Sequence, residues 1–164
     1  VCAKGKIPFV LDPAPAQELP AEIFQHVTWI TPNQIEAVYL TGIQEANANR
    51  EAPAAMARAL LSKGCGGVLL KRGAHGAYLA SSFDDGKFVS AFPVKAVDTT
   101  AAGDAFNGGF ATGLMMGKSP FESAQFAAAV AAVSVTRAGA QPSMPSMSDV
   151  QKLMESGLVE VAEK

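Results

Sequence analysis

The stretch with the clearest chemical potential is Asp98–Asp104, in which two aspartates enclose five Thr, Ala and Gly residues. Small residues let a ligand come close to the backbone. We expect a helix to begin near Ala102, and the unpaired N–H groups at the positive end of a helix favour an anion, most often phosphate. Asp104 would lie in the first turn of that helix. Its carboxylate is therefore a candidate base for phosphoryl transfer.

The same stretch also has an ordinary explanation. An aspartate in the first turn of a helix is common for dipole reasons alone, and Thr-Ala-Ala-Gly can be a simple loop. A second candidate pair, Asn33 and Glu36, stands three residues apart where we expect another helix to begin, so both side chains would share one face and could meet one ligand. Alternatively, Asn33 is only a helix cap and Glu36 is a surface residue.

Other local patterns carry less weight. Gly73–Gly76 predicts a tight turn after a strand, which could cover an adenine ring or could be a turn and nothing more. Lys71 and Arg72 could touch phosphate, although basic residues at strand ends are usually solvated. The segment Gly113–Ser119 resembles a phosphate-binding P-loop, but it has three residues between its glycines where that motif needs four, and it follows no strand.

Composition limits the class of protein. The chain has 164 residues, of which 49% are apolar and 17% charged, which is typical of a globular domain. A net charge of −2 gives no electrostatic reason to expect nucleic acid or an anionic membrane as a partner. The longest strongly apolar run, residues 126–135, is too short to span a bilayer. Cys2 and Cys65 lack CxxC spacing, so neither a zinc site nor a disulfide framework is indicated. Isolated thiols fit a reducing compartment, and we therefore expect a cytoplasmic location.

Hydrophobic patterning predicts strands that alternate with helices through the first half of the chain. The predicted strands are residues 7–11, 28–31, 66–73, 77–81 and 87–93, with a hairpin turn at 83–86. The predicted helices are residues 20–27, 33–40 with Asn33 or Thr31 as cap, 46–63, 102–116, 120–135 and 146–156. This order favours an α/β domain with a mostly parallel sheet, which binds ligands at the carboxyl ends of its strands. The loops 12–15, 31–36, 71–76 and 97–104 would lie there.

Five segments, in this order and at these spacings, resemble the C-terminal half of the ribokinase-like carbohydrate kinases. They are Leu11–Ala16, Ile30–Ala37, Leu40–Gly42, Val97–Asn107 and Thr136–Ser143. The resemblance runs from Ile7 to about Leu153. It implies a three-layer α/β/α fold that lacks the N-terminal strands and the β lid of the family. Residues 1–164 would then be the part of a longer kinase that binds ATP and carries the catalytic base, as the abrupt start at Val1 also suggests.

The resemblance implies a reaction as well. ATP would phosphorylate D-ribose at its 5-hydroxyl, giving ribose 5-phosphate and ADP, with Asp104 as the base that receives the hydroxyl proton. Ala101, Ala102 and Gly103 would offer backbone N–H groups to the transferred phosphoryl, and Gly103 and Asp104 would also contact the nucleotide. Asn33 and Glu36 would belong to the Mg²⁺–phosphate region, Glu36 through metal-bound water. The nucleotide would further be bordered by Lys71, Arg72, Gly73, Ala74, His75, Gly76 and Ala128.

Family members of this type also hold a monovalent cation, usually K⁺, beside the anion site. The matching positions are Asp98 and the carbonyl of Thr100 on one side, and the carbonyls of Ser134, Arg137 and Gly139 with the hydroxyl of Ser143 on the other. Such a cation would order the loop that presents the N–H groups. Three positions depart from the family pattern: Asp12 replaces an Asn, Gln34 a Glu, and Lys71 a Thr or Ser.

Two alternatives stay open. The kinase could act on another substrate of the family, such as fructose, 2-keto-3-deoxygluconate or a nucleoside, since the residues that read the sugar belong to the N-terminal half. The chain could instead be a non-catalytic nucleotide-binding or assembly module. For the full-length kinase we expect a homodimer with ATP, a small sugar, Mg²⁺ and K⁺ as its ligands. We expect the isolated chain to be inactive, because it cannot close a water-excluding site over the sugar.

Overall fold

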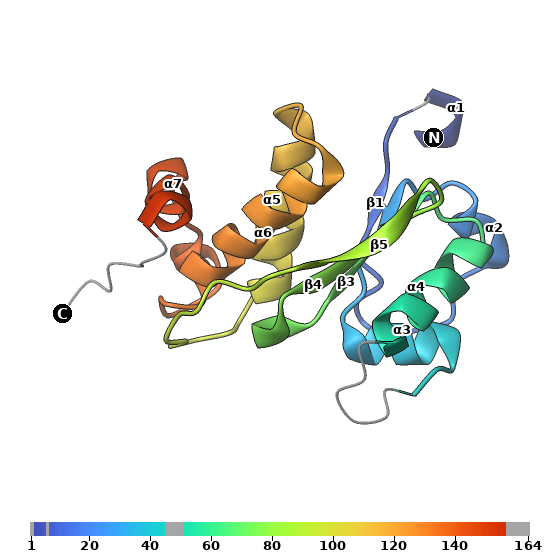
Figure 1. The fold of residues 1–164 in the computed structure, drawn as a ribbon, viewed down its shortest axis with the longest axis horizontal. Coiled ribbons are helices and arrows are strands. Elements are labelled where there is room, and N and C mark those ends of the chain that lie inside the picture. The colour runs from blue at the N-terminus through green and yellow to red at the C-terminus, as the bar shows by residue number, and fades with distance from the viewer. Residues whose placement is uncertain (1, 6, 45–50, 157–164) are drawn as a thin grey trace. The chain divides into compact units, whose positions relative to one another are not determined.

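The computed structural model describes residues 2–5, 7–44 and 51–156 (Figure 1). The chain divides into two compact units: the first comprises residues 1–72 and 77–88, and the second comprises residues 73–76 and 89–164. The strands are β1 (Val10–Leu11), β2 (Trp29–Ile30), β3 (Gly67–Lys71), β4 (Ala77–Ser81) and β5 (Asp84–Val89). The α-helices are α1 (Cys2–Gly5), α2 (Ala21–Phe24), α3 (Gln34–Thr41), α4 (Glu51–Ser62), α5 (Ala102–Met115), α6 (Pro120–Ser134) and α7 (Met147–Ser156).

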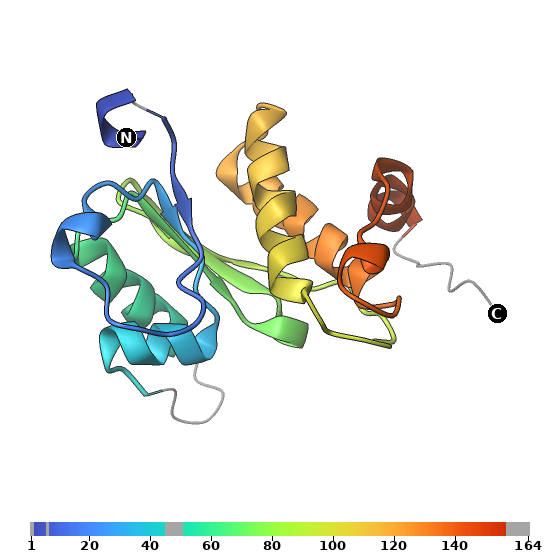
Figure 2. The same ribbon diagram turned by 180° about the vertical axis from the view of Figure 1, so that it is seen from behind.

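The strands form one sheet in the order β1-β2-β3-β4-β5, with β1 at one edge (Figure 2). Strands β1, β2 and β3 run parallel, and Ile30 stands opposite Leu11 on one side and Val68 on the other. Strand β4 runs antiparallel to β3. The expected α/β fold is confirmed, but the sheet is mixed. The reason is the link after β3: a single turn of 3₁₀ helix at Gly73–His75 is too short to be the crossover that a parallel strand requires.

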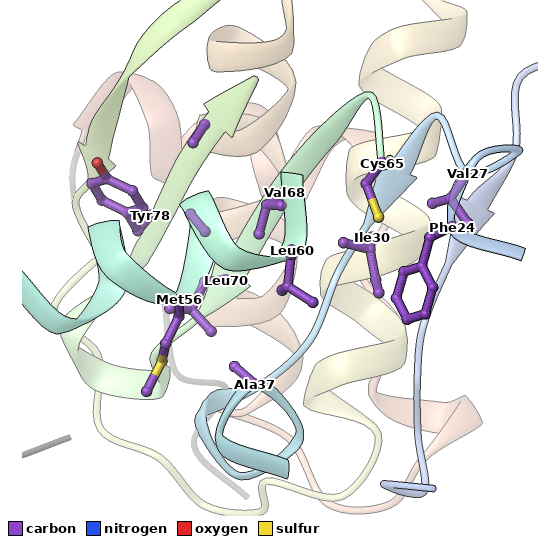
Figure 3. Close-up of a cluster of buried hydrophobic side chains, with 12 residues drawn as sticks. Phe24, Val27, Ile30, Ala37, Met56, Leu60, Cys65, Val68, Leu70 and Tyr78 are labelled. Carbon is purple, nitrogen blue, oxygen red and sulfur yellow. The ribbon is translucent and has the colours of Figure 1, made fainter. Parts of the chain in front are cut away.

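Helices α3 and α4 cover the sheet of the first unit on one side (Figure 1). Met56 and Leu60 of α4 belong to one buried cluster with Ile30 on β2 and with Val68 and Leu70 on β3 (Figure 3). Four consecutive residues of β3 are buried, so side chains on both faces of this strand are covered, as expected for a central strand. This core fixes the carboxyl ends of β1, β2 and β3 relative to one another.

In the second unit, α5 and α6 lie side by side (Figures 1 and 2). A Cβ atom on Gly109 would collide with Ala127 and Val130, and one on Gly113 with the backbone of Ser123. Gly109 and Gly113 therefore allow close contact between α5 and α6, and Gly113 lies inside a helix and not in a P-loop. Helix α7 completes this second core through Val150 and Leu153, which cluster with residues of α6.

Some expected boundaries change. The hairpin turn is at Ser82 and Phe83, so the expectation of a turn at 83–86 was wrong: β5 already begins at Asp84. Gly86 is needed inside the strand, because a Cβ there would collide with the Tyr78 hydroxyl. The helix expected over 46–63 is observed from Glu51 to Ser62, and residues 45–50 lie outside the described part of the chain. Within the residues described, none of the helices is both long and apolar enough to cross a membrane.

Candidate functional site

The first group of expected site residues lies at the carboxyl edge of the first unit, where α3 begins. Asn33 caps α3: its side-chain oxygen accepts from the N–H of Glu36 at 2.9 Å. Glu36 reaches back, and its two carboxylate oxygens accept from the N–H and Nδ2 of Asn33 at 2.7 and 2.8 Å. The cap interpretation is confirmed. The interpretation of Glu36 as a surface residue was wrong, since it is only 5% exposed.

This capping box changes how Glu36 can serve a ligand. The carboxylate is turned toward Asn33, so the two side chains face each other and do not point side by side at one ligand. Each carboxylate oxygen has a second acceptor site, and a carboxylate held in this way can still bind metal-bound water. The oxygen chemistry of Glu36 thus fits a magnesium ion held through water.

An ion pair lies at the same edge. The Lys71 ammonium is 3.2 and 3.1 Å from the two carboxylate oxygens of Asp12. The backbone N–H of Lys71 donates to the carbonyl of Pro32 at 2.8 Å, and Asn33 and Lys71 form an isolated parallel bridge. Lys71 is therefore not a solvated strand-end residue. It stands next to the start of α3.

The residues after Lys71 form the expected tight turn. The Arg72 guanidinium lies over the Phe88 ring, 5.6 Å from its centroid. In the second unit, Gly73, Ala74 and His75 are exposed, and the N–H of Gly76 donates to the carbonyl of Gly73 at 3.0 Å. Gly76 has a φ of 80°, and a Cβ there would collide with the Val89 carbonyl, so only glycine fits.

The second group of site residues surrounds the start of α5. The N-cap is Ala101, with φ 59° and ψ 16°, and its methyl side chain makes no capping hydrogen bond. Among the residues described, Ala101 is the only non-glycine residue with a positive φ. Such a conformation costs roughly 1–2 kcal/mol for a residue with a Cβ atom. The backbone at this point is therefore held in an unfavourable state by its surroundings.

The N–H groups at this helix start are mostly unused. Ala102 donates to the carbonyl of Thr99 at 3.1 Å, and Ala105 donates to that of Ala101 at 2.9 Å. Within the described ranges, the N–H groups of Ala101, Gly103 and Asp104 have no acceptor at hydrogen-bonding distance. Gly103 and Asp104 are also exposed. The geometry offers an anion several free donors with a carboxylate next to them.

Asp98 ties this loop to the segment after α6. Its two carboxylate oxygens accept from the N–H of Thr100 at 2.9 Å and from the N–H of Gly139 at 2.8 Å. The hydrogen bonds from Thr100, followed by that from Gly139, lower the pKa of Asp98 to about 2. The carbonyl of Val135 adds a second tie by accepting from the N–H groups of Val97 and Asp98. One side chain thus joins two loops that are 41 residues apart in the sequence.

The segment after α6 is held by buried hydroxyls. Ser134 and Ser143 are fully buried, with their hydroxyl oxygens 3.0 Å apart, and the Ser143 hydroxyl donates to the carbonyl of Ala140 at 2.7 Å. The Arg137 guanidinium is paired with Asp149 at 3.1 Å. Because a guanidinium has no acceptor atom, only the backbone carbonyl of Arg137 could bind a cation. Carbonyl, hydroxyl and carboxylate oxygens are the ligand types that a hard monovalent ion prefers, so the residue types at these positions fit such an ion.

Ala128 is the expected site residue with the least surface to offer. It is 7% exposed within α6.

Sequence reasoning missed three contacts: the pairing of Asp12 with Lys71, the bonds from Asp98 to two loops, and the pairing of Arg137 with Asp149. For the first, the two opposite charges are visible at strand ends in the sequence, but their pairing depends on the order of the strands in the sheet.

Known proteins resemble most of the chain. The sequence profile of the pfkB family carbohydrate kinases matches residues 1–147. Ribokinase from Haemophilus influenzae is 39% identical over 155 residues, which are 94% of this chain and 50% of that protein. Ribokinase from Schizosaccharomyces pombe is 37% identical over 151 residues, covering 92% and 48%. The chain therefore spans about half the length of the relatives it matches.

Solved structures agree with the sequence matches. The crystal structure of ribokinase from Thermotoga maritima superposes with a TM-score of 0.84 at 40% identity, covering 94% of this chain and 52% of that one. The structure of Arabidopsis thaliana ribokinase complexed with ribose and ATP gives a TM-score of 0.87 at 33% identity, covering 93% and 49%. The described residues thus have a ribokinase-like α/β fold.

Proposed function

The chain belongs to the pfkB family of carbohydrate kinases, and from this premise we propose that it is the C-terminal part of an ATP-dependent ribose kinase. In this proposal residues 1–164 bind the nucleotide and carry the catalytic base, and the full-length protein, called the parent kinase below, converts ribose and ATP to ribose 5-phosphate and ADP. The observation that carries the proposal is the start of α5, where the N–H groups of Ala101, Gly103 and Asp104 have no acceptor among the described residues and the exposed Asp104 lies in the first turn. The ribokinase relatives and the ribose-bound structure support ribose as the sugar.

The start of α5 would act on the phosphoryl group. Phosphoryl transfer depends mostly on positioning and on stabilising the charge that spreads over the transferred group. The N–H groups of Ala101 and Gly103 would donate to those oxygens, and that of Asp104 is available to join them. The N–H of Ala102 is already used by Thr99. The Asp104 carboxylate would accept the proton from the sugar hydroxyl. At the same time the hydroxyl oxygen would bond to the γ-phosphorus and the bond between that phosphorus and ADP would break.

The first unit would hold the rest of the nucleotide phosphates. Glu36 would hold Mg²⁺ through water, and Asn33 would keep its carboxylate in place. When bound, magnesium neutralises phosphate charge. Lys71 and Arg72 of this unit would border the nucleotide, and so would two parts of the second unit, the turn Gly73–Gly76 and, as a smaller contact, Ala128.

The segment after α6 would hold the monovalent cation. The donors would be the carboxylate of Asp98, the carbonyls of Thr100, Ser134, Arg137 and Gly139, and the hydroxyl of Ser143. The role of these residues is positional, because Asp98 already connects the loop of Thr100 to Gly139. A homodimer and a cytoplasmic location remain predictions for the parent kinase.

The test is a substrate panel with the parent kinase. We expect release of ADP that depends on ribose and rises with K⁺, and that is slower with fructose, 2-keto-3-deoxygluconate or a nucleoside. Faster release of ADP with one of those three would identify that compound, and not ribose, as the substrate, and the chain would still belong to a kinase of the same family. ATP binding without any sugar response would favour the non-catalytic module and contradict the proposal.

A further inference from the structure

An ion pair closes the segment that follows α6. Arg137 lies at the start of this segment and Asp149 lies in the first turn of α7, and their side chains meet at 3.1 Å. The two side chains are 38% and 32% exposed. A single pair with this exposure contributes little to stability, because water screens it. Its position in the chain therefore indicates its role better than its strength does.

The carboxylate oxygen that Arg137 contacts is held by α7. The N–H and the hydroxyl of Ser146 donate to this oxygen of Asp149 at 3.0 and 2.7 Å, and the Ser146 hydroxyl accepts from the N–H of Asp149 at 3.3 Å. The helix is anchored in turn, because Val150 and Leu153 are buried in a cluster with residues of α6. The guanidinium thus meets a carboxylate that a packed helix keeps in place.

The backbone of Arg137 has fewer restraints than its side chain. Its N–H donates to the carbonyl of Ser134 at 3.1 Å, but no backbone N–H of the described residues donates to the Arg137 carbonyl. The next residue, Ala138, is exposed, and the N–H of Gly139 is bound to the Asp98 carboxylate. The ion pair is therefore the contact through which α7 restrains the orientation of this carbonyl.

We propose that Asp149 sets the affinity for K⁺ by holding Arg137 so that its carbonyl faces the cation. Asp149 is a positioning residue, because it acts through Arg137 and touches neither the cation nor the substrate. The inference rests on the proposed function, which takes the Arg137 carbonyl as a ligand of the monovalent cation. It extends that site to helix α7, which the proposed function leaves out.

Charge and orientation predict opposite results when the guanidinium is removed. The guanidinium and K⁺ have the same charge, so its loss would favour cation binding if charge alone acted. If the ion pair orients the carbonyl, the same loss weakens cation binding, because a ligand that is not held in place binds less well. Arg137→Leu keeps the carbonyl and removes only the guanidinium, so this variant distinguishes the two mechanisms.

The experiment measures K⁺ binding to the 164-residue chain without nucleotide or sugar. Urea denaturation is compared in KCl and in choline chloride at one ionic strength, and the additional stability in KCl gives the dissociation constant for K⁺. We expect Arg137→Leu and Asp149→Asn each to raise this constant by about threefold or more, because both release the carbonyl. The double variant should show no more than the larger single effect, since both changes break one contact.

A third variant separates K⁺ binding from stability. Ser146→Ala removes the capping hydroxyl of α7 but leaves the pair of Arg137 and Asp149 in place. It should lower the urea midpoint in choline chloride, because the helix cap is weakened. Its dissociation constant for K⁺ should stay within about twofold of that of the unsubstituted chain. A purely structural role of Asp149 would not separate the two quantities in this way.

Matched controls are Arg58→Leu and Asp84→Asn, which make the same charge changes at exposed positions of the first unit. Tighter K⁺ binding by Arg137→Leu overturns the inference, because the guanidinium then acts only as a like charge. Unchanged K⁺ binding in Arg137→Leu also overturns it, and this variant decides if circular dichroism shows that Asp149→Asn does not fold.

Two further outcomes count against the inference. An equal loss of K⁺ binding in Ser146→Ala overturns it, because the effect then follows the stability of α7 and not the ion pair. If the unsubstituted chain gains no stability from KCl, both the inference and the proposed cation site are wrong. Ribose kinase activity is decided separately, because the substrate panel measures release of ADP and not cation binding.

Discussion

Helix α3 begins with a complete capping box, whereas helix α5 begins with an alanine in a left-handed conformation and no side-chain cap. At α3, Asn33 and Glu36 satisfy each other's backbone donors, and Glu36 is buried in doing so. At α5, the N–H groups of Gly103 and Asp104 have no acceptor in the part of the chain that the structure describes. The backbone donors at the start of α3 are thus satisfied within the helix cap, whereas those at the start of α5 are not.

This difference shows how stability and function are divided between them. A side-chain cap stabilises a helix start by about 1 kcal/mol, and the capping box makes α3 a rigid support. Helix α5 lacks that contribution and carries a strained residue as well. Its stability comes from close contact with α6 at Gly109 and Gly113. The donors at its start thus remain available for a ligand.

The largest effect is expected at α5 itself. Asp104→Asn in the parent kinase should lower kcat by roughly 10²–10⁴-fold, because the base is lost. ATP affinity should change by less than about threefold, since the backbone donors remain. Steady-state kinetics and ATP titration measure the two quantities. Full turnover by this variant would contradict the assignment of the base, and Asp84→Asn on exposed β5 is the control.

A smaller effect is expected where the α5 loop is tied to the segment after α6. In Asp98→Asn, an amide N–H₂ replaces one acceptor, so a donor faces the N–H of Thr100 or of Gly139. We expect the K⁺ concentration for half-maximal activity to rise by about tenfold or more, comparable to the loss of a ligand or its support. Potassium titration of the parent kinase tests this. An unchanged potassium response would place the cation elsewhere, and Glu22→Gln controls for the lost charge.

The comparison also shows what sequence could and could not provide. The start of α5 at Ala102 and the Asn33 cap follow from local residue types, and both were predicted correctly. The burial of Glu36 and the partner of Asp12 depend on the register of strands that are distant in sequence, which no local pattern encodes. The hairpin turn was predicted at the wrong residues because Asp-Asp-Gly is a typical turn sequence. In the structure Gly86 lies in a strand, and a glycine is needed there because a Cβ atom would collide with the Tyr78 side chain.

The stability of the capped helix starts can be measured directly. Asn33→Ala should lower the free energy of unfolding by about 2 kcal/mol, because the cap is lost and the buried Glu36 loses its partner. Ser119→Ala removes the same kind of box at α6, where Glu122 is exposed, and should cost about 1 kcal/mol. Urea denaturation of the chain compares the two. Equal costs would show that burial of the glutamate adds nothing.

The box at α6 should also depend on pH. Hydrogen bonds from the hydroxyl and N–H of Ser119 lower the pKa of Glu122 below its usual value of about 4.3. The folded pKa is therefore below the unfolded one, so the contribution is complete above about pH 5 and is lost as the pH falls through the folded pKa. The cost of Ser119→Ala should accordingly shrink between about pH 4.3 and lower values. A constant cost over that range would show that Glu122 is not part of the cap energy.

The smallest expected change in the free energy of unfolding comes from relieving the backbone strain at Ala101. The same variant tests whether that strain matters for activity. Ala101→Gly removes the left-handed penalty but frees the unfolded chain, so the free energy of unfolding should rise by only about 0.5 kcal/mol. Gly42→Ala is the reverse change at a left-handed helix end with open space around it, and it should cost about 1 kcal/mol. Urea denaturation measures both changes.

In the parent kinase, Ala101→Gly should reduce kcat severalfold despite the added stability, because a glycine no longer holds the N–H groups in one orientation. The alanine methyl restricts the backbone, and this restriction keeps the donors of α5 in place without a side-chain cap. A variant that gains both stability and turnover would show that the strain at Ala101 serves no purpose in the site. The contrast between the two helix starts would then reflect only how each one is stabilised.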